Sequence, residues 1–202
     1  MGRAPHPDNL AVSWGKLLSL ALRAGLKCDA ESASSNSRIL RITREWLATQ
    51  SNRSDILVVI QWSTWEREEW LHDGVYYQVN ASGIDHVPQS LQEKYRNYIV
   101  GIDWQTKTEQ AHNQIWEFHK ELEEQGIKHI FFNGNNNFSI VKKHLDWGKN
   151  YISPYDSDYT FDALIRAQGI QTVAPNSWHF GKDGHSFFHR FMLQYIIDNK
   201  FI

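Results

Sequence analysis

The sequence predicts an α/β fold, built as a three-layer sandwich around a mostly parallel sheet. Two continuous apolar runs, at residues 54–62 and 127–134, are typical of strands that are covered on both faces. Amphipathic helical patterns precede and separate these runs, so helices and strands alternate along the chain. We expect a single domain over residues 1–202, because no linker or repeat interrupts this pattern.

The first half of the chain has the clearest start and stop signals. Gly25 fits the position just after the end of a helix, and Ser35 or Asn36 would cap the next helix. We expect helices at 13–27 and 34–50, and strands at 26–32 and 54–62.

The second half repeats the alternation with longer irregular segments. Gly126 and Gly169 would each end a helix. We expect irregular chain at 75–104 and 135–160, a strand at 127–134, and helices at 106–126, 160–169 and 182–200.

The segments that follow the strands are where a binding site is expected, because open α/β sheets bind ligands beyond the carboxyl ends of their strands. Residues 63–70 carry three glutamates and Arg67 directly after the strongest strand. Arg67 could grip an anion with its two-pronged guanidinium. The interpretation that we favour is that this segment is the solvated start of a helix, where carboxylates are stabilised by the helix dipole.

Composition excludes several classes of protein. The net charge of −2 gives no basic surplus for binding nucleic acid. No apolar run is long enough to span a membrane, and the N-terminus has no signal-peptide core. The one cysteine permits no internal disulfide, which fits the cytoplasm or another reducing compartment. We expect no cofactor and no metal, since His185 and His189 have helical spacing but lack the accompanying glutamate of a zinc motif.

The stretch NSWHFGKDGH, residues 176–185, resembles the last motif block of the SGNH (GDSL-type) hydrolases. That block is Asp-x-x-His, followed by a Gly-His pair that opens the final helix. The resemblance implies a flavodoxin-like sheet and ester or acyl-ester hydrolysis by a serine nucleophile. It places His179 as the catalytic base and Asn176 where the supporting aspartate normally lies.

Two middle blocks carry a weaker resemblance. Residues 31–40 are similar to the block whose glycine N–H faces the oxyanion, with Ala33 at the glycine position and Asn36 as a candidate for substrate binding. Residues 55–67 are similar to the strand and Gly-x-Asn-Asp block, with Thr64 where the asparagine donor lies. The resemblance therefore implies Ala33 and Thr64 as oxyanion donors.

The first block, which holds the nucleophilic serine, is missing from the chain. We expect that block and its strand to lie just upstream of Met1. In a 2-1-3-4-5 sheet this strand lies between the strands at 26–32 and 54–62, so its loss would leave two backbone edges unpaired. Otherwise another segment must pair there, or those two strands must pair directly.

The function predicted from the sequence is ester hydrolysis on an SGNH-like fold. The alternative is a non-catalytic binding or assembly module on the same fold. Nine tryptophans could then line a cleft for a carbohydrate or a partner protein, although large aromatic side chains equally serve as core. Both hypotheses exclude nucleic acid and membrane as partners, and neither fixes an oligomeric state.

Overall fold

The computed structural model describes residues 7–175 and 177–202, which form two compact units. The first unit holds the described residues up to Ser32 together with Asp158–Ile202, and the second unit is Ala33–Ser157. Helices alternate with the parallel strands along the chain, which confirms the α/β class. The single domain stays a prediction. Within the described part of the chain, no helix has the length and apolar character of a membrane span.

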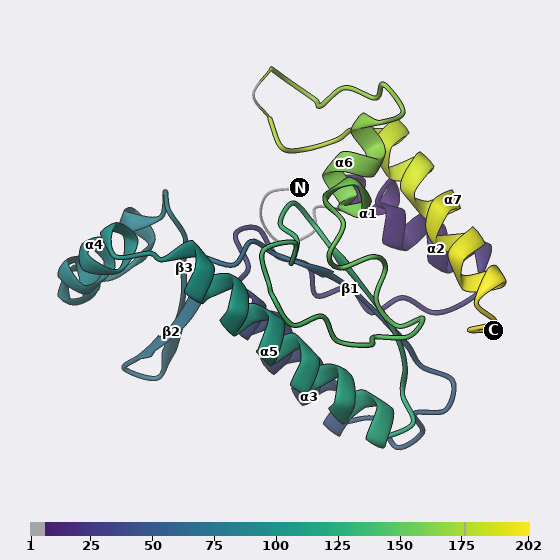
Figure 1. Ribbon diagram of the computed structural model, residues 1–202, viewed down its shortest axis with the longest axis horizontal. Coiled ribbons are helices and arrows are strands. Elements are labelled where there is room, and N and C mark those ends of the chain that lie inside the picture. Colours follow the sequence, from purple (N-terminus) through teal and green to yellow (C-terminus); the bar gives the residue numbers. More distant parts are fainter. Residues whose placement is uncertain (1–6, 176) are drawn as a thin grey trace. The chain divides into compact units, whose positions relative to one another are not determined.

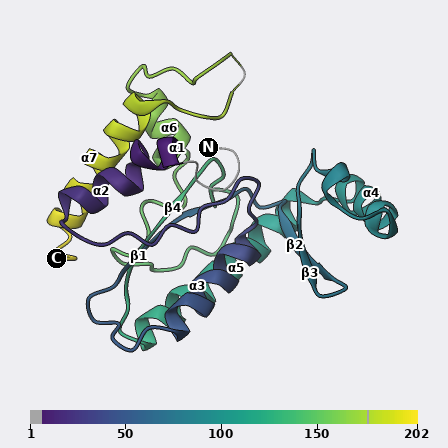
Figure 2. The same ribbon diagram turned by 180° about the vertical axis from the view of Figure 1, so that it is seen from behind.

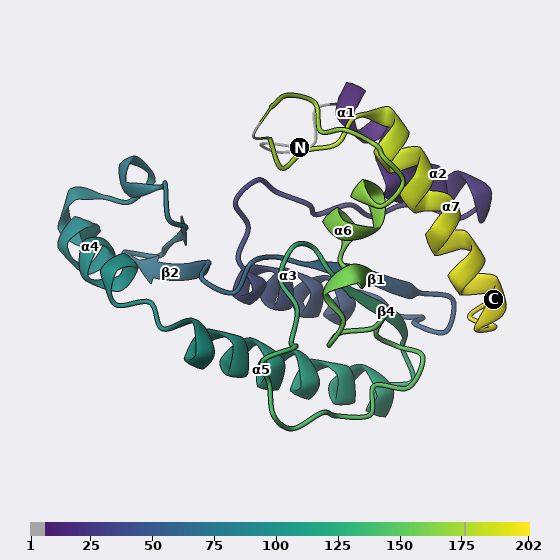
Figure 3. The same ribbon diagram turned by 45° about the horizontal axis from the view of Figure 1, so that its top comes forward.

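The first unit is built from helices. They are α1 (Pro7–Ala11), α2 (Trp14–Ala21), α6 (Phe161–Arg166) and α7 (Lys182–Asp198). Helices α2 and α7 lie side by side (Figure 3), and the ring of Trp14 meets the ring of Phe188 edge-on at 5.7 Å. The buried apolar side chains of this unit include Leu18, Phe161, Ile165, Phe188, Met192 and Ile196.

Helix α2 is shorter than the predicted helix at 13–27. It ends at Ala21, and Arg23 takes a left-handed backbone conformation with φ of 52°. Arg23 thus serves as the helix stop that we predicted for Gly25. The predicted strand at 26–32 is wrong, because these residues are irregular and pair with no strand in the described chain.

The second unit contains the parallel strands β1 (Leu57–Trp62) and β4 (Lys128–Asn133). They pair directly and in register, with Trp62 opposite Asn133 at their carboxyl ends. Beyond β4, an isolated parallel bridge joins Phe131 to Tyr151. On the other side of β1, no strand of the described residues is paired, so β1 has a free edge.

Helices α3 (Asn36–Ala48) and α5 (Trp104–Glu124) lie side by side along the parallel strands (Figures 1 and 2). Both share one core with the face of β1 that carries Val58, Ile60 and Trp62. The main members of this core are Leu40, Leu47, Val58, Ile60, Trp62, Ile115, Phe118, Leu122 and Phe131. The two long helices thus cover one face of the strand pair, and a three-layer, flavodoxin-like sandwich is not confirmed.

An antiparallel hairpin follows β1 where a helix start was the favoured interpretation. Strands β2 (Glu68–His72) and β3 (Val75–Val79) are joined by Asp73 and Gly74, whose φ angles are 50° and 75°. An Asp-Gly pair of this kind forms the two-residue turn that suits tight hairpins. The helix prediction for residues 63–70 is therefore wrong.

The prediction of irregular chain at 75–104 is also mostly wrong, because most of this segment forms regular secondary structure. Besides β3, it contains the 3-10 turns η1 (Ile84–His86) and η2 (Gln89–Leu91) and helix α4 (Gln92–Val100). The hairpin and α4 enclose a small second core of Trp70, Val79, Val87 and Tyr95. The other predicted helices are confirmed as α3, α5, α6 and α7, with ends that differ by a few residues.

Candidate functional site at the carboxyl end of β1

The site is organised by a clasp between Asn36 and Ser63. The side-chain oxygen of Asn36 accepts a hydrogen bond from the Ser63 backbone N–H at 2.8 Å. The side-chain NH₂ of Asn36 donates to the Ser63 backbone carbonyl at 3.2 Å. Asn36 is buried, so these bonds replace water on both groups. The clasp ties the first residue of α3 to the residue that follows β1, across 27 positions of sequence.

Ser35, one of the two caps that we predicted, caps α3 and also connects the helix to the hairpin. Its hydroxyl accepts from the Arg38 N–H at 3.2 Å, and its own N–H donates to the side-chain oxygen of Gln78 at 3.0 Å. Gln78 in turn donates to Glu69 at 2.8 Å. The start of α3, the end of β1 and strand β3 therefore meet at one place.

Ala33 lies just before this cap, and its backbone is left-handed with φ of 61°. This conformation is unfavourable for every residue with a Cβ and is normally taken by glycine. Within the described residues the Ala33 N–H has no hydrogen-bond acceptor. Ala33 thus presents a free donor at the position where the resemblance implies the glycine of an oxyanion hole.

The segment after β1 contains polar groups that only partly satisfy one another. The Thr64 hydroxyl donates to Glu66 at 2.8 Å, and the Arg67 guanidinium donates to the Ser63 hydroxyl at 3.0 Å. One carboxylate oxygen of Glu66 and the Nε of Arg67 are buried and have no hydrogen-bond partner. The Arg67 Nε lies 3.9 Å from the other carboxylate oxygen of Glu66, so the two side chains form an ion pair. Buried polar atoms are rarely left without a hydrogen bond, and ordered water is their usual partner.

The carboxyl end of β4 is held closely against the end of β1. The Gly134 N–H donates to the Trp62 carbonyl at 3.0 Å, and a Cβ on Gly134 would lie 2.8 Å from that oxygen. Asn133 is buried, accepting from the Tyr151 hydroxyl at 2.5 Å and donating to the Pro154 carbonyl at 3.1 Å. Burial raises the pKa of Tyr151 well above its ordinary value, so its hydroxyl stays protonated and donating.

The predicted catalytic base belongs to the other unit. His179 is exposed and precedes α7; its backbone N–H donates to the Ser177 hydroxyl at 3.1 Å, and its carbonyl accepts from Val173 at 2.9 Å. The predicted partner of the base, Asn176, lies outside the described residues. The structure therefore groups Ala33, Asn36, Thr64 and Arg67 in the second unit, whereas His179 lies in the first.

The second histidine of the same stretch has a structural role. His185 is buried in the first turn of α7, and its Nδ1 accepts from the Trp14 N–H at 3.3 Å. Burial lowers the pKa of His185 to about 4, so the ring is neutral near pH 7 and can accept this bond. Among the described residues, no three side chains of the metal-binding types are placed to hold a metal ion.

Sequence reasoning missed the role of Ser63 and counted Glu66 only as one of three glutamates in residues 63–70. Ser63 carries no local signal, because its partner Asn36 lies 27 positions earlier in the chain. The hairpin did have a signal, namely the Asp73-Gly74 turn between alternating apolar residues. Of the tryptophans, Trp62, Trp65, Trp70 and Trp147 are buried, so for these four the core interpretation is confirmed.

The fold and the site define an α/β protein with polar groups gathered at the carboxyl ends of two parallel strands. Residues 7–116 match the model of a family described as "Family of unknown function (DUF6071)". Because this match covers more than half of the chain, the protein belongs to that family. No curated protein and no solved structure matches the chain.

Proposed function

We propose that this protein is an ester hydrolase with a flavodoxin-like, SGNH-type arrangement of its site. The observation that carries the proposal is the left-handed Ala33 with its free N–H, beside the capped start of α3 and the end of β1. A strained backbone of this kind is retained where it orients a group, and an unpaired N–H is what an oxyanion requires. The clasp between Asn36 and Ser63 supports it by fixing α3 against β1.

The free edge of β1 is the second support for this proposal. The run Leu57–Ile60 is apolar throughout, which is typical of a strand inside a sheet that is covered on both faces, yet among the described residues β1 is paired only with β4. One further parallel strand at this edge would satisfy its backbone groups. In the proposed arrangement that strand carries the nucleophilic serine, and it is not among the described residues.

The proposed reaction uses each residue in a distinct role. The serine oxygen attacks the ester carbonyl while His179 takes its proton, and the oxyanion receives the Ala33 N–H. His179 returns the proton to the departing alcohol, and water then hydrolyses the acyl-serine in the same manner. Thr64 can serve as a second oxyanion donor only if its hydroxyl leaves Glu66. Arg67, whose side chain is 32% exposed, offers its guanidinium to the substrate.

Hydrolysis of short-chain p-nitrophenyl esters by the natural protein tests this proposal. We expect His179→Ala to lower kcat by about 100-fold or more, as is typical for loss of a general base. The matched control is His86→Ala, because His86 is also exposed and lies in η1 of the second unit. Equal loss in both variants, or full activity in His179→Ala, would exclude His179 from the reaction.

A non-catalytic binding module is the second candidate function. The favourable observation is that the Thr64 hydroxyl and both amide atoms of Asn36 already have partners within the protein. These groups are then structural, and the partly exposed Arg67 guanidinium would contact a bound partner. Absence of turnover by the natural protein with every ester tested would favour this second candidate.

A further inference from the structure

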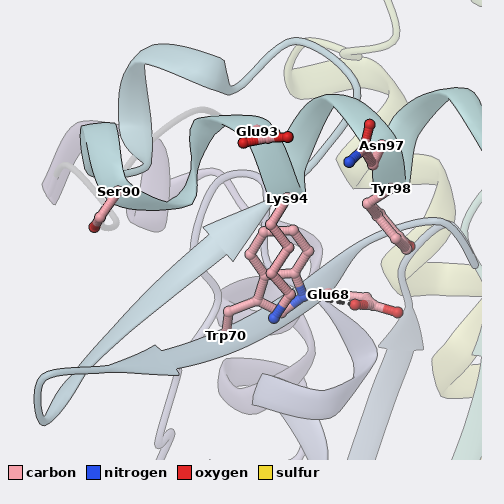
Figure 4. A pocket seen from close by; sticks show the side chains of 7 residues that line it. All are labelled: Glu68, Trp70, Ser90, Glu93, Lys94, Asn97 and Tyr98. Carbon is pink, nitrogen blue, oxygen red and sulfur yellow. Dashed lines mark hydrogen bonds between the residues drawn. The ribbon is translucent and has the colours of Figure 1, made fainter.

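A separate pocket lies between the hairpin and helix α4, and Figure 4 shows its side chains. Trp70 and Glu68 enter from strand β2, while Glu93, Lys94 and Asn97 project from α4. The pocket lies wholly within the second unit. Glu68 and Trp70 belong to the segment 63–70 where a site was expected, but the residues predicted for the hydrolase site do not line this pocket.

The strand side of the pocket is rigidly held. The indole N–H of Trp70 donates to Glu68 at 2.6 Å, and Lys107 donates to the other carboxylate oxygen. Burial alone would raise the pKa of Glu68, but the bonds from Lys107 and Trp70 outweigh it, and the pKa lies below its ordinary value. Tyr98 meets the Trp70 ring edge-on at 5.6 Å, which fixes the orientation of the indole.

The helix side of the pocket is free to rearrange. Glu93, Lys94 and Asn97 are exposed, and within the described residues their side chains make no hydrogen bond or ion pair. Lys94 places its ammonium over the Trp70 ring, 4.1 Å from the ring centre (Figure 4). Trp70 is only 7% exposed, and the flexible, exposed Lys94 side chain is part of its cover. A single cation–π contact contributes only about 0.5–2 kcal/mol, so a ligand that replaces Lys94 on the ring loses little.

The charges of the pocket select against ionic ligands. Glu68 and Glu93 contribute two negative charges, and Lys94 and the Lys107 that binds Glu68 contribute two positive ones. An anion would meet the carboxylates, and a cation would have to displace Lys94 from the ring that it already covers. A hydroxyl group both donates and accepts, so it suits a site that offers carboxylate, amide and ammonium together.

We propose that this pocket binds a neutral saccharide, whose ring face packs on Trp70 while its hydroxyls bond to Glu93, Asn97 and the displaced Lys94. Aromatic faces cover the apolar side of a sugar ring, and the surrounding polar groups fix its orientation. The inference goes beyond ester hydrolysis and does not depend on it, because it concerns binding at residues that the proposed reaction does not use.

The test is a titration of the ¹⁵N-labelled protein with cellobiose and with N,N′-diacetylchitobiose, followed by the indole N–H signal of Trp70. We expect this signal to shift with a saturating curve at millimolar sugar, which is ordinary for a small, open site. Inorganic phosphate and choline are the anionic and cationic probes, and neither should shift it. The signals of Trp104, which is exposed outside the pocket, provide the internal reference.

Two exposed variants show whether the sugar uses the helix side. We expect Glu93→Gln and Asn97→Ala each to weaken binding by about three- to tenfold, the effect of one lost hydrogen bond. The matched controls are Glu124→Gln and Asn135→Ala, which change exposed residues outside the pocket.

Three results would overturn the saccharide site. They are an unshifted Trp70 signal with both sugars, a shift with phosphate or choline in their place, and unchanged affinity in both pocket variants. Because the titration measures only binding, a negative result would not contradict the proposed ester hydrolysis. In the same way, absence of esterase activity would not contradict sugar binding in this pocket.

Discussion

Replacing Asn36 by alanine should destabilise the second unit by about 2–3 kcal/mol. The change removes two hydrogen bonds, each contributing about 1 kcal/mol, and leaves the half-buried N–H and carbonyl of Ser63 without those partners. Because Ser63 is half-buried, water recovers part of the loss, which sets the upper limit. Seven of the nine tryptophans lie in this unit, so tryptophan fluorescence during urea unfolding reports mainly on it.

Two comparison variants separate the clasp from the general effect of losing an asparagine. Asn135→Ala removes an exposed amide in the turn after β4 and should change the unfolding free energy by less than about 0.5 kcal/mol. Asn36→Asp keeps the acceptor for the Ser63 N–H but sets a carboxylate against the Ser63 carbonyl at neutral pH. It should regain stability in acid, where the protonated carboxyl can donate. A cost for Asn36→Ala no larger than that for Asn135→Ala would refute the clasp.

Three further predictions concern helix packing, acid sensitivity and the hairpin turn. Gly184→Ala places a Cβ 2.6 Å from the Phe180 Cβ and should destabilise the first unit by about 1–3 kcal/mol, whereas Gly15→Ala, which meets no atom within 4 Å, should not. Calorimetry decides this, and equal melting temperatures would contradict it. Burial lowers the pKa of His129 to about 4, so between pH 6.5 and 4 this histidine is protonated in the unfolded chain and neutral in the folded protein. The free energy of unfolding should therefore fall by up to about 3 kcal/mol over this range. His129→Gln should flatten that part of the stability curve, and an unchanged slope would exclude His129 as its source. Gly74→Ala should cost about 1 kcal/mol in urea unfolding because φ is 75° there, and a neutral result would contradict the turn assignment.

Local patterns in the sequence were sufficient for the elements that form the frame of the second unit. The apolar run of β1, the amphipathic faces of α3 and α5, and the cap at Ser35 each depend on residues a few positions apart. Such patterns predict the element correctly wherever the tertiary structure buries its apolar face. The prediction of a strand at 26–32 was wrong because the pattern there is short. A short segment forms a strand only where a neighbouring strand can pair with its backbone.

The hairpin shows how tertiary contacts overrode a plausible local interpretation. The glutamates of residues 63–70 suggested a solvated helix start, yet the Glu69 side chain is only 4% exposed and is held by the Arg41 guanidinium at 2.7 and 2.8 Å. A buried carboxylate needs such a partner, and this partner comes from a helix 28 positions earlier. No window of local sequence contains both residues.

The sequence by itself determined the α/β class, the main helices and the two parallel strands, because their periodicities are local properties of the chain. Only the tertiary structure decided the sites. It showed that the Asn36 amide clasps Ser63, that Ala33 is held in a left-handed conformation, and that Lys94 covers Trp70. These arrangements depend on strand register and on contacts between segments that are far apart in the sequence. Such contacts form only when the chain packs into its native fold, so no local pattern predicts them.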